Sequence, residues 1–82
     1  MSREVIQYLV LDRCDRRCNM ARYYALTIEP TLFGDFAFIR EWGRIGRPGQ
    51  RRVEFLDSPT LAMEELDTWI KRKCRKGYSI RE

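Results

Sequence analysis

The chain has 82 residues, of which 44% are hydrophobic, and a formal net charge of +4 at neutral pH. This length predicts one domain over residues 1–82, and the apolar content excludes an intrinsically disordered chain. The sequence has neither a long apolar run nor an apolar leader region, so we expect a cytoplasmic protein, free or nucleoid-associated, without membrane contact.

The first third of the chain predicts two strands. A nearly continuous run of apolar residues indicates a strand over residues 4–11, and the polar stretch over residues 12–20 indicates a loop. Residues 22–29 alternate in polarity, as expected of a half-buried strand. One face of this second strand carries the larger apolar side chains Tyr24, Leu26 and Ile28.

A hairpin follows. Residues 35–42 alternate, and one face carries Phe36, Phe38, Arg40 and Trp42. Arg47–Gln50 fits a type II turn, because Pro48 sets φ at the second position and Gly49 accepts positive φ at the third. In the return strand over residues 51–56, we expect Val53 and Phe55 to point inward, and Arg52 and Glu54 outward.

The last third predicts one helix. Asp57 or Ser58 caps it and Pro59 suits its first turn. Helical spacing predicts a buried stripe of Ala62, Leu66, Trp69, Ile70 and Lys73, in which Trp69 is a core residue. Gly77 is the expected stop. The predicted fold class is therefore α+β, with one antiparallel sheet of four or five strands and one long helix on it.

Few residues offer chemistry for catalysis. The chain has no histidine to activate a nucleophile, and Glu64 and Glu65 are adjacent on a helix, so they do not face each other. Three cysteines and no histidine leave a closed zinc site one ligand short. Cys14 and Cys18 flank the cations Arg16 and Arg17, which leaves a redox role open beside that of ordinary thiols. We expect no enzyme activity, metal or cofactor.

Positive charge is concentrated in two segments. Residues 40–52 hold five arginines and one acid, and residues 71–76 hold five basic residues and no acid. Such segregation favours a polyanion-binding face, although cations in the last turns of a helix also suit its dipole. Trp42 and Arg44 lie two apart on an extended chain and point the same way, which suits a base or sugar with its phosphate. A structural cation–π pair is the alternative.

The segment Trp42-Gly43-Arg44-Ile45-Gly46, with Pro48-Gly49-Gln50 after it, resembles the signature of the WGR domain. The resemblance covers about residues 5–79 and is strongest to small stand-alone bacterial members. It includes Asn19 with Arg22–Leu26, Leu32–Gly34, Arg40–Trp42, Ala62, Leu66, Lys73 and Lys76–Tyr78.

The resemblance implies an antiparallel sheet with one helix, and a contact with DNA. In poly(ADP-ribose) polymerases the domain meets DNA at a break, where the motif tryptophan packs on the terminal nucleotide. By resemblance, Trp42 stacks and Arg44 holds phosphate or couples to a partner. These 82 residues hold no catalytic or zinc-finger segment, so the resemblance supports nucleic-acid binding more than break sensing.

The sequence thus predicts a nucleic-acid-binding module, with DNA favoured over RNA. The candidate contact residues are Trp42, Gly43, Arg44, Arg40, Arg47, Gln50, Arg51, Lys73, Lys76 and Tyr78. A protein-interaction adaptor using the same surface is the alternative. A homodimer is a third reading, because exposed sheet edges can pair between chains.

Overall fold

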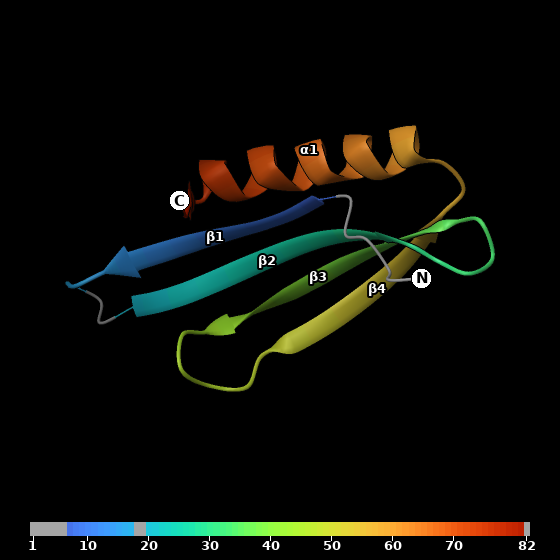
Figure 1. Ribbon diagram of the computed structural model, residues 1–82. Coiled ribbons are helices and arrows are strands. Elements are labelled where there is room, and N and C mark those ends of the chain that lie inside the picture. The colour runs from blue at the N-terminus through green and yellow to red at the C-terminus, as the bar shows by residue number, and fades with distance from the viewer. Residues whose placement is uncertain (1–6, 18–19, 82) are drawn as a thin grey trace.

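The computed structural model describes residues 7–17 and 20–81, and it places one helix on one face of a five-stranded antiparallel sheet (Figure 1). The strands are β1 (Gln7–Asp15), β2 (Met20–Pro30), β3 (Phe36–Arg44), β4 (Gln50–Leu56) and β5 (Ser79–Ile80), and the helix is α1 (Pro59–Arg75). Their order across the sheet is β4-β3-β2-β1-β5. The predicted fold class is confirmed.

The strands are longer than the sequence predicts. β1 continues to Asp15, through residues predicted as a loop, because Asp12–Asp15 pair with Met20–Tyr23 of β2. The polar residues there tolerate a strand because the ladder satisfies their backbone groups. The part of the first predicted strand over residues 4–6 lies outside the described residues.

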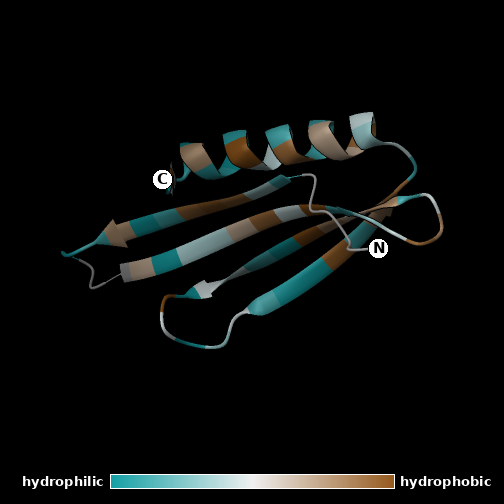
Figure 2. Ribbon diagram, viewed as in Figure 1, coloured by the Kyte–Doolittle hydropathy of each residue, from teal (hydrophilic) through white to brown (hydrophobic). Residues whose placement is uncertain are grey.

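The core lies between the sheet and α1. Leu11, Leu26, Ile28 and Phe38 are fully buried, and Ala62 and Leu66 of α1 cover them. Brown, apolar bands on α1 alternate with teal, polar ones, as expected of a helix with one buried side (Figure 2).

The ends of α1 follow the predicted capping chemistry. Ser58 is the N-cap, and its Oγ accepts a hydrogen bond from the Leu61 backbone N–H at 3.2 Å. Gly77 follows the helix with φ +94°, a left-handed conformation that favours glycine. Asp67 and Lys71 form the expected ion pair at 2.9 Å. The chain then returns to the sheet, where Ile80 of β5 pairs with Leu11.

The orientation predicted for β4 is wrong. Glu54 pairs with Phe38 and Arg52 with Arg40, so these polar residues lie on the helix-covered face. Val53 and Phe55 lie on the other face and are 39% and 64% exposed. The reason is Arg40, which is buried in β3 and needs the neighbouring carboxylate of Glu54, 3.0 Å away.

The hairpin turn also lies earlier than predicted. The Arg47 backbone N–H donates to the Arg44 carbonyl at 3.1 Å, and Gly46, not Gly49, has the positive φ, at +85°. The type II geometry therefore uses Arg44–Arg47. Pro48 and Gly49 lead directly into β4.

Candidate nucleic-acid interface

A cleft of about 540 Å³ opens between the hairpin end of the sheet and the C-terminal half of α1. Strands β2, β3 and β4 supply its floor and one wall, and α1 with its C-cap supplies the other wall. The lining residues are Tyr24, Arg40, Trp42, Gln50, Arg51, Arg52, Trp69, Arg72, Lys73 and Lys76.

Aromatic rings form the floor of the cleft. The Tyr24 ring is buried and lies nearly parallel to Trp42, with centroids 5.6 Å apart, and to Trp69, with centroids 5.9 Å apart. Both tryptophans are half-buried. Trp42 is thus neither sealed in the core nor fully exposed, and it borders the cleft. Trp69 packs against the core as predicted but also lines the cleft, which sequence analysis missed.

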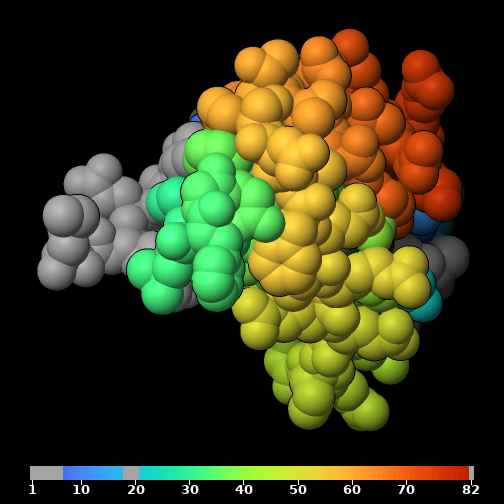
Figure 3. Space-filling view, turned by 90° about the vertical axis from the view of Figure 1, so that its right-hand side faces the viewer, coloured from blue at the N-terminus to red at the C-terminus, as the bar shows by residue number. Residues whose placement is uncertain are grey.

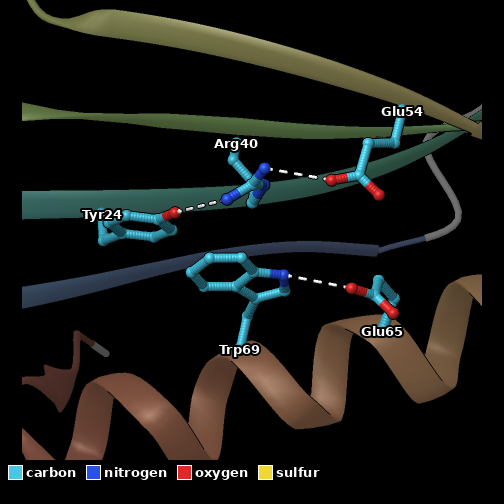
Figure 4. Close-up of polar contacts among 5 residues, drawn as sticks. All are labelled: Tyr24, Arg40, Glu54, Glu65 and Trp69. Atoms are coloured by element: carbon cyan, nitrogen blue, oxygen red, sulfur yellow. Dashed lines mark hydrogen bonds and ion pairs between the residues drawn. The ribbon is translucent and has the colours of Figure 1, made fainter.

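Arg40 is the buried cation of this floor (Figure 4). Its Nη1 donates to the Tyr24 hydroxyl at 3.3 Å, its Nη2 meets Glu54, and its guanidinium lies 4.1 Å from the Trp69 ring centroid. The Trp69 indole N–H in turn donates to Glu65 on the same helix. Within the described part of the chain, Arg40 Nε is buried without a hydrogen-bond partner.

The two basic segments of the sequence meet at this cleft. Arg40, Arg51 and Arg52 come from the sheet, and Arg72, Lys73 and Lys76 come from the helix end. Arg72 stacks on Trp69 at 4.6 Å, and the Lys73 amine lies 4.4 Å from the Tyr24 ring centroid. None of the described lining residues is acidic. Two of these arginines pair with carboxylates outside the lining: Arg40 with Glu54 at 3.0 Å, and Arg51 with Glu41 at 3.9 Å.

The pKa of Lys73 reflects its burial and the concentration of positive charge in the cleft. Desolvation by burial lowers its pKa below the ordinary value of 10.5, and the charges of Lys76, Arg40 and Arg72 lower it further. A lowered lysine pKa means that positive charge at this position is disfavoured in the free protein. A bound anion would oppose the second cause, the repulsion by neighbouring cations.

The predicted contact residues fall into two groups. Six of them line the cleft, namely Arg40, Trp42, Gln50, Arg51, Lys73 and Lys76. The other four do not: Gly43, Arg44 and Arg47 lie toward the hairpin tip, and the Tyr78 ring makes an edge-to-face contact with Tyr24, with centroids 6.4 Å apart. Arg44 nevertheless shares the helix-side face of β3 with Trp42, as the two-residue spacing predicts.

Sequence analysis missed Tyr24, Arg52, Trp69 and Arg72. One available signal was helical spacing, because positions 69, 72, 73 and 76 fall on one side of a helix. Arg52 was missed because the wrong orientation predicted for β4 placed it on the outer face. Of the cysteines, Cys14 and Cys74 are exposed free thiols, and Cys18 lies outside the described residues.

No helix within the described ranges is long and apolar enough to cross a membrane. Among the same residues, no group of histidine, cysteine or acidic side chains is placed to hold a metal ion.

The model of the WGR domain family matches residues 7–82 of the chain. The uncharacterized protein y4dW of Sinorhizobium fredii (strain NBRC 101917 / NGR234) is 42% identical over 73 residues. The match covers 89% of this chain but 36% of y4dW, so the chain spans little more than a third of that curated relative. No solved structure matches the chain.

Proposed function

We propose that this chain, which belongs to the WGR domain family, binds DNA through the cleft between the β3–β4 hairpin and the end of α1. The WGR domain is generally a nucleic-acid-binding module. The observation that carries the proposal is the meeting of two basic segments around two tryptophans, with no acidic side chain among the described lining residues. The proposed role is binding without catalysis, in the cytoplasm or on the nucleoid.

Each component of the cleft suits one part of a nucleotide. Guanidinium and ammonium groups on both walls can hold phosphates, and the half-buried ring of Trp42 can pack on a sugar or a base. Arg40 stiffens the floor, because its hydrogen bonds and its stacking on Trp69 fix the rings in place before a ligand arrives. Arg44 and Arg47 extend the contact along the hairpin toward adjoining phosphates.

Titration with short duplex DNA at two salt concentrations tests this proposal. Three phosphate contacts would make the affinity fall by about 40-fold between 50 and 200 mM salt. Both tryptophans line the cleft, so their intrinsic fluorescence should change on binding. An affinity that is indifferent to salt would rule out phosphate contacts. Stronger binding of an RNA of the same sequence would support the cleft as the binding site and identify RNA as the preferred ligand.

Trp42→Leu should weaken DNA binding by about tenfold, because base or sugar stacking on an aromatic ring contributes about 1–3 kcal/mol. Leucine keeps apolar packing against Tyr24, so the variant should stay folded by circular dichroism. Trp42→Phe is the matched control, since it keeps an aromatic face and should retain most of the affinity. Equal affinity of the leucine variant and the parent protein would show that Trp42 is a packing residue only.

Binding should also lose affinity as the pH rises toward, but below, the ordinary lysine pKa of 10.5. The lowered pKa means that Lys73 becomes neutral earlier than an ordinary lysine, and the neutral amine no longer attracts phosphate. Lys73→Arg, which stays charged throughout, should remove this pH dependence. If the arginine variant loses affinity over the same pH range, another group is responsible.

A further inference from the structure

β4 is the outer strand at one edge of the sheet. An outer strand presents unpaired backbone groups along one side, which another strand can complete. At the opposite edge, β5 has two residues, whereas β4 has seven and pairs with β3 in an unbroken register from Leu56 to Gln50. β4 contains no proline, so each residue whose N–H points away from β3 can donate to a second ladder.

Two arginines on an outer strand ordinarily discourage pairing between chains. The order of charges along β4 avoids this repulsion when the partner strand is a second copy of β4. In an antiparallel pair, side chains that lie directly opposite each other point to the same face of the sheet. When a twofold axis relates two copies of β4, this condition requires the axis to pass through one residue, which then lies opposite its own copy. Centring on Val53 pairs all seven residues of Gln50–Leu56 with those of the second copy.

In that register the charges match. On the helix-covered face, Arg52 lies opposite Glu54 of the second copy, and the same pair occurs twice. On the other face, Val53 meets its own copy, and Arg51, which pairs with Glu41 of its own chain at 3.9 Å, lies opposite Phe55 of the second copy. The neighbouring registers place Arg52 opposite Arg52 or Glu54 opposite Glu54, and like charges directly opposite each other are destabilising. Full overlap and charge matching therefore select the same register.

Exposed apolar side chains adjoin this edge. Leu32 and Phe33, in the loop before β3, are 86% and 93% exposed, and they line a hollow of about 350 Å³ with Val53 and Phe55. Figure 3 shows the green atoms of this loop beside the yellow atoms of β4. The loop is held in shape by a hydrogen bond from the Thr31 backbone N–H to the Asp35 carbonyl at 3.0 Å. An apolar surface at an unpaired strand is typical of an interface.

We infer that two copies of this chain associate through β4, centred on Val53, to form one continuous ten-stranded sheet. A twofold axis normal to the sheet keeps both helices on the same side. Because β4 also lines the cleft, the two clefts flank the axis on that side and face one polyanion together. The inference goes beyond the proposed function, because the pairing does not depend on what the cleft binds.

Light scattering coupled to gel filtration tests the pairing. We expect the parent protein to have about twice the chain mass of 9.9 kDa. Val53→Lys should return it to the monomer mass, because it places two ammonium groups opposite each other on the axis. Tyr8→Lys is the matched control, since Tyr8 is an exposed residue on the same face of β1, and it should leave the dimer intact.

Cysteine cross-linking tests the register. In a chain whose native cysteines are replaced by serine, Val53→Cys should form an intermolecular disulfide on mild oxidation. A mixture of Arg51→Cys and Phe55→Cys chains should cross-link more than either variant alone, because these positions lie opposite each other. A monomeric parent protein at millimolar concentration, or a Val53→Lys variant that folds and remains a dimer, would overturn the inference.

Discussion

Replacing Arg72 and Lys76 with glutamine should weaken DNA binding by roughly 10- to 100-fold near 0.1 M salt and reduce the salt slope by about 1.8, if each contacts one phosphate. Both side chains line the cleft, and Arg72 also stacks on Trp69. The readout is the slope of log affinity against log salt, measured by fluorescence anisotropy with labelled duplex. This slope counts phosphate contacts independently of any uniform loss of stability.

Two other basic residues of α1 provide a matched control for the Arg72 and Lys76 variant. Lys71 and Arg75 lie one position earlier on α1 with the same four-residue spacing, and neither lines the cleft. Lys71→Gln with Arg75→Gln removes the same charge from the same turns, so long-range and helix-dipole effects are matched. This control should lose little affinity and keep most of the slope. If the two double variants behave alike, binding follows net charge and not the cleft.

The comparison also separates a DNA-binding cleft from a protein-interaction adaptor. A pull-down partner that survives nuclease treatment and still depends on Arg72 and Lys76 would favour the adaptor. A partner lost on nuclease treatment would favour nucleic acid. The geometry bears on this choice, since a cleft lined by six cationic side chains and no described acidic one suits a polyanion better than a typical protein surface, where both signs occur.

Local chemistry was sufficient to predict most of the fold. The alternation of Tyr24, Leu26 and Ile28 placed these residues on the core face, where they are buried. Ser58 and Pro59 allowed the helix start to be predicted. The first turn of a helix needs an acceptor for its free backbone N–H groups, which the Ser58 hydroxyl supplies, and it accepts a proline, whose φ is already helical. Such signals depend on near neighbours in the sequence, so they can be read without knowing the tertiary structure.

The errors depend on contacts between distant segments. The orientation of β4 was mistaken because apolar Val53 and Phe55 compete locally with Arg52 and Glu54 for the core face. What decides the outcome is Arg40, fourteen residues from Glu54, which is buried on the helix side and takes its carboxylate partner there. The periodicity of a single strand carries no information about such a buried partner on its neighbour.

The site shows the same division. The Trp42–Gly46 motif and the two basic segments were visible in the sequence, but their relative placement was not. The packing of α1 on the sheet decides that Arg72, Lys73 and Lys76 face Trp42 across one cleft. Once the stripe of Ala62 and Leu66 is known to be the buried side of α1, Trp69 and Lys73 continue along it to the cleft wall.

Gly49→Ala should destabilise the domain by about 1–3 kcal/mol, which is the usual range for forcing an extra carbon into a packed site. Gly49 does not have a positive φ, so its role is to leave space. A Cβ on this residue would lie closer than 3.0 Å to the Trp42 carbonyl oxygen and to the Tyr23 hydroxyl. The Trp42 carbonyl belongs to the backbone of β3 and cannot rotate away. A loss of this size should lower the melting temperature by roughly 4–24 °C.

Two further variants isolate the cause. Tyr23→Phe removes the hydroxyl obstacle but leaves the Trp42 carbonyl in place, so it should rescue little of the stability of Gly49→Ala. Gly46→Asn should be milder than Gly49→Ala, because nothing lies within 4 Å of a Cβ at Gly46 and asparagine tolerates its φ of +85°. Since the carbonyl that the added Cβ would meet belongs to Trp42, the alanine variant should also change the near-ultraviolet circular dichroism of the stacked rings. An unchanged melting temperature for Gly49→Ala would mean that β3 and β4 can move apart at the hairpin with little loss of unfolding free energy. The close approach of Gly49 would then not be what fixes the Trp42 ring.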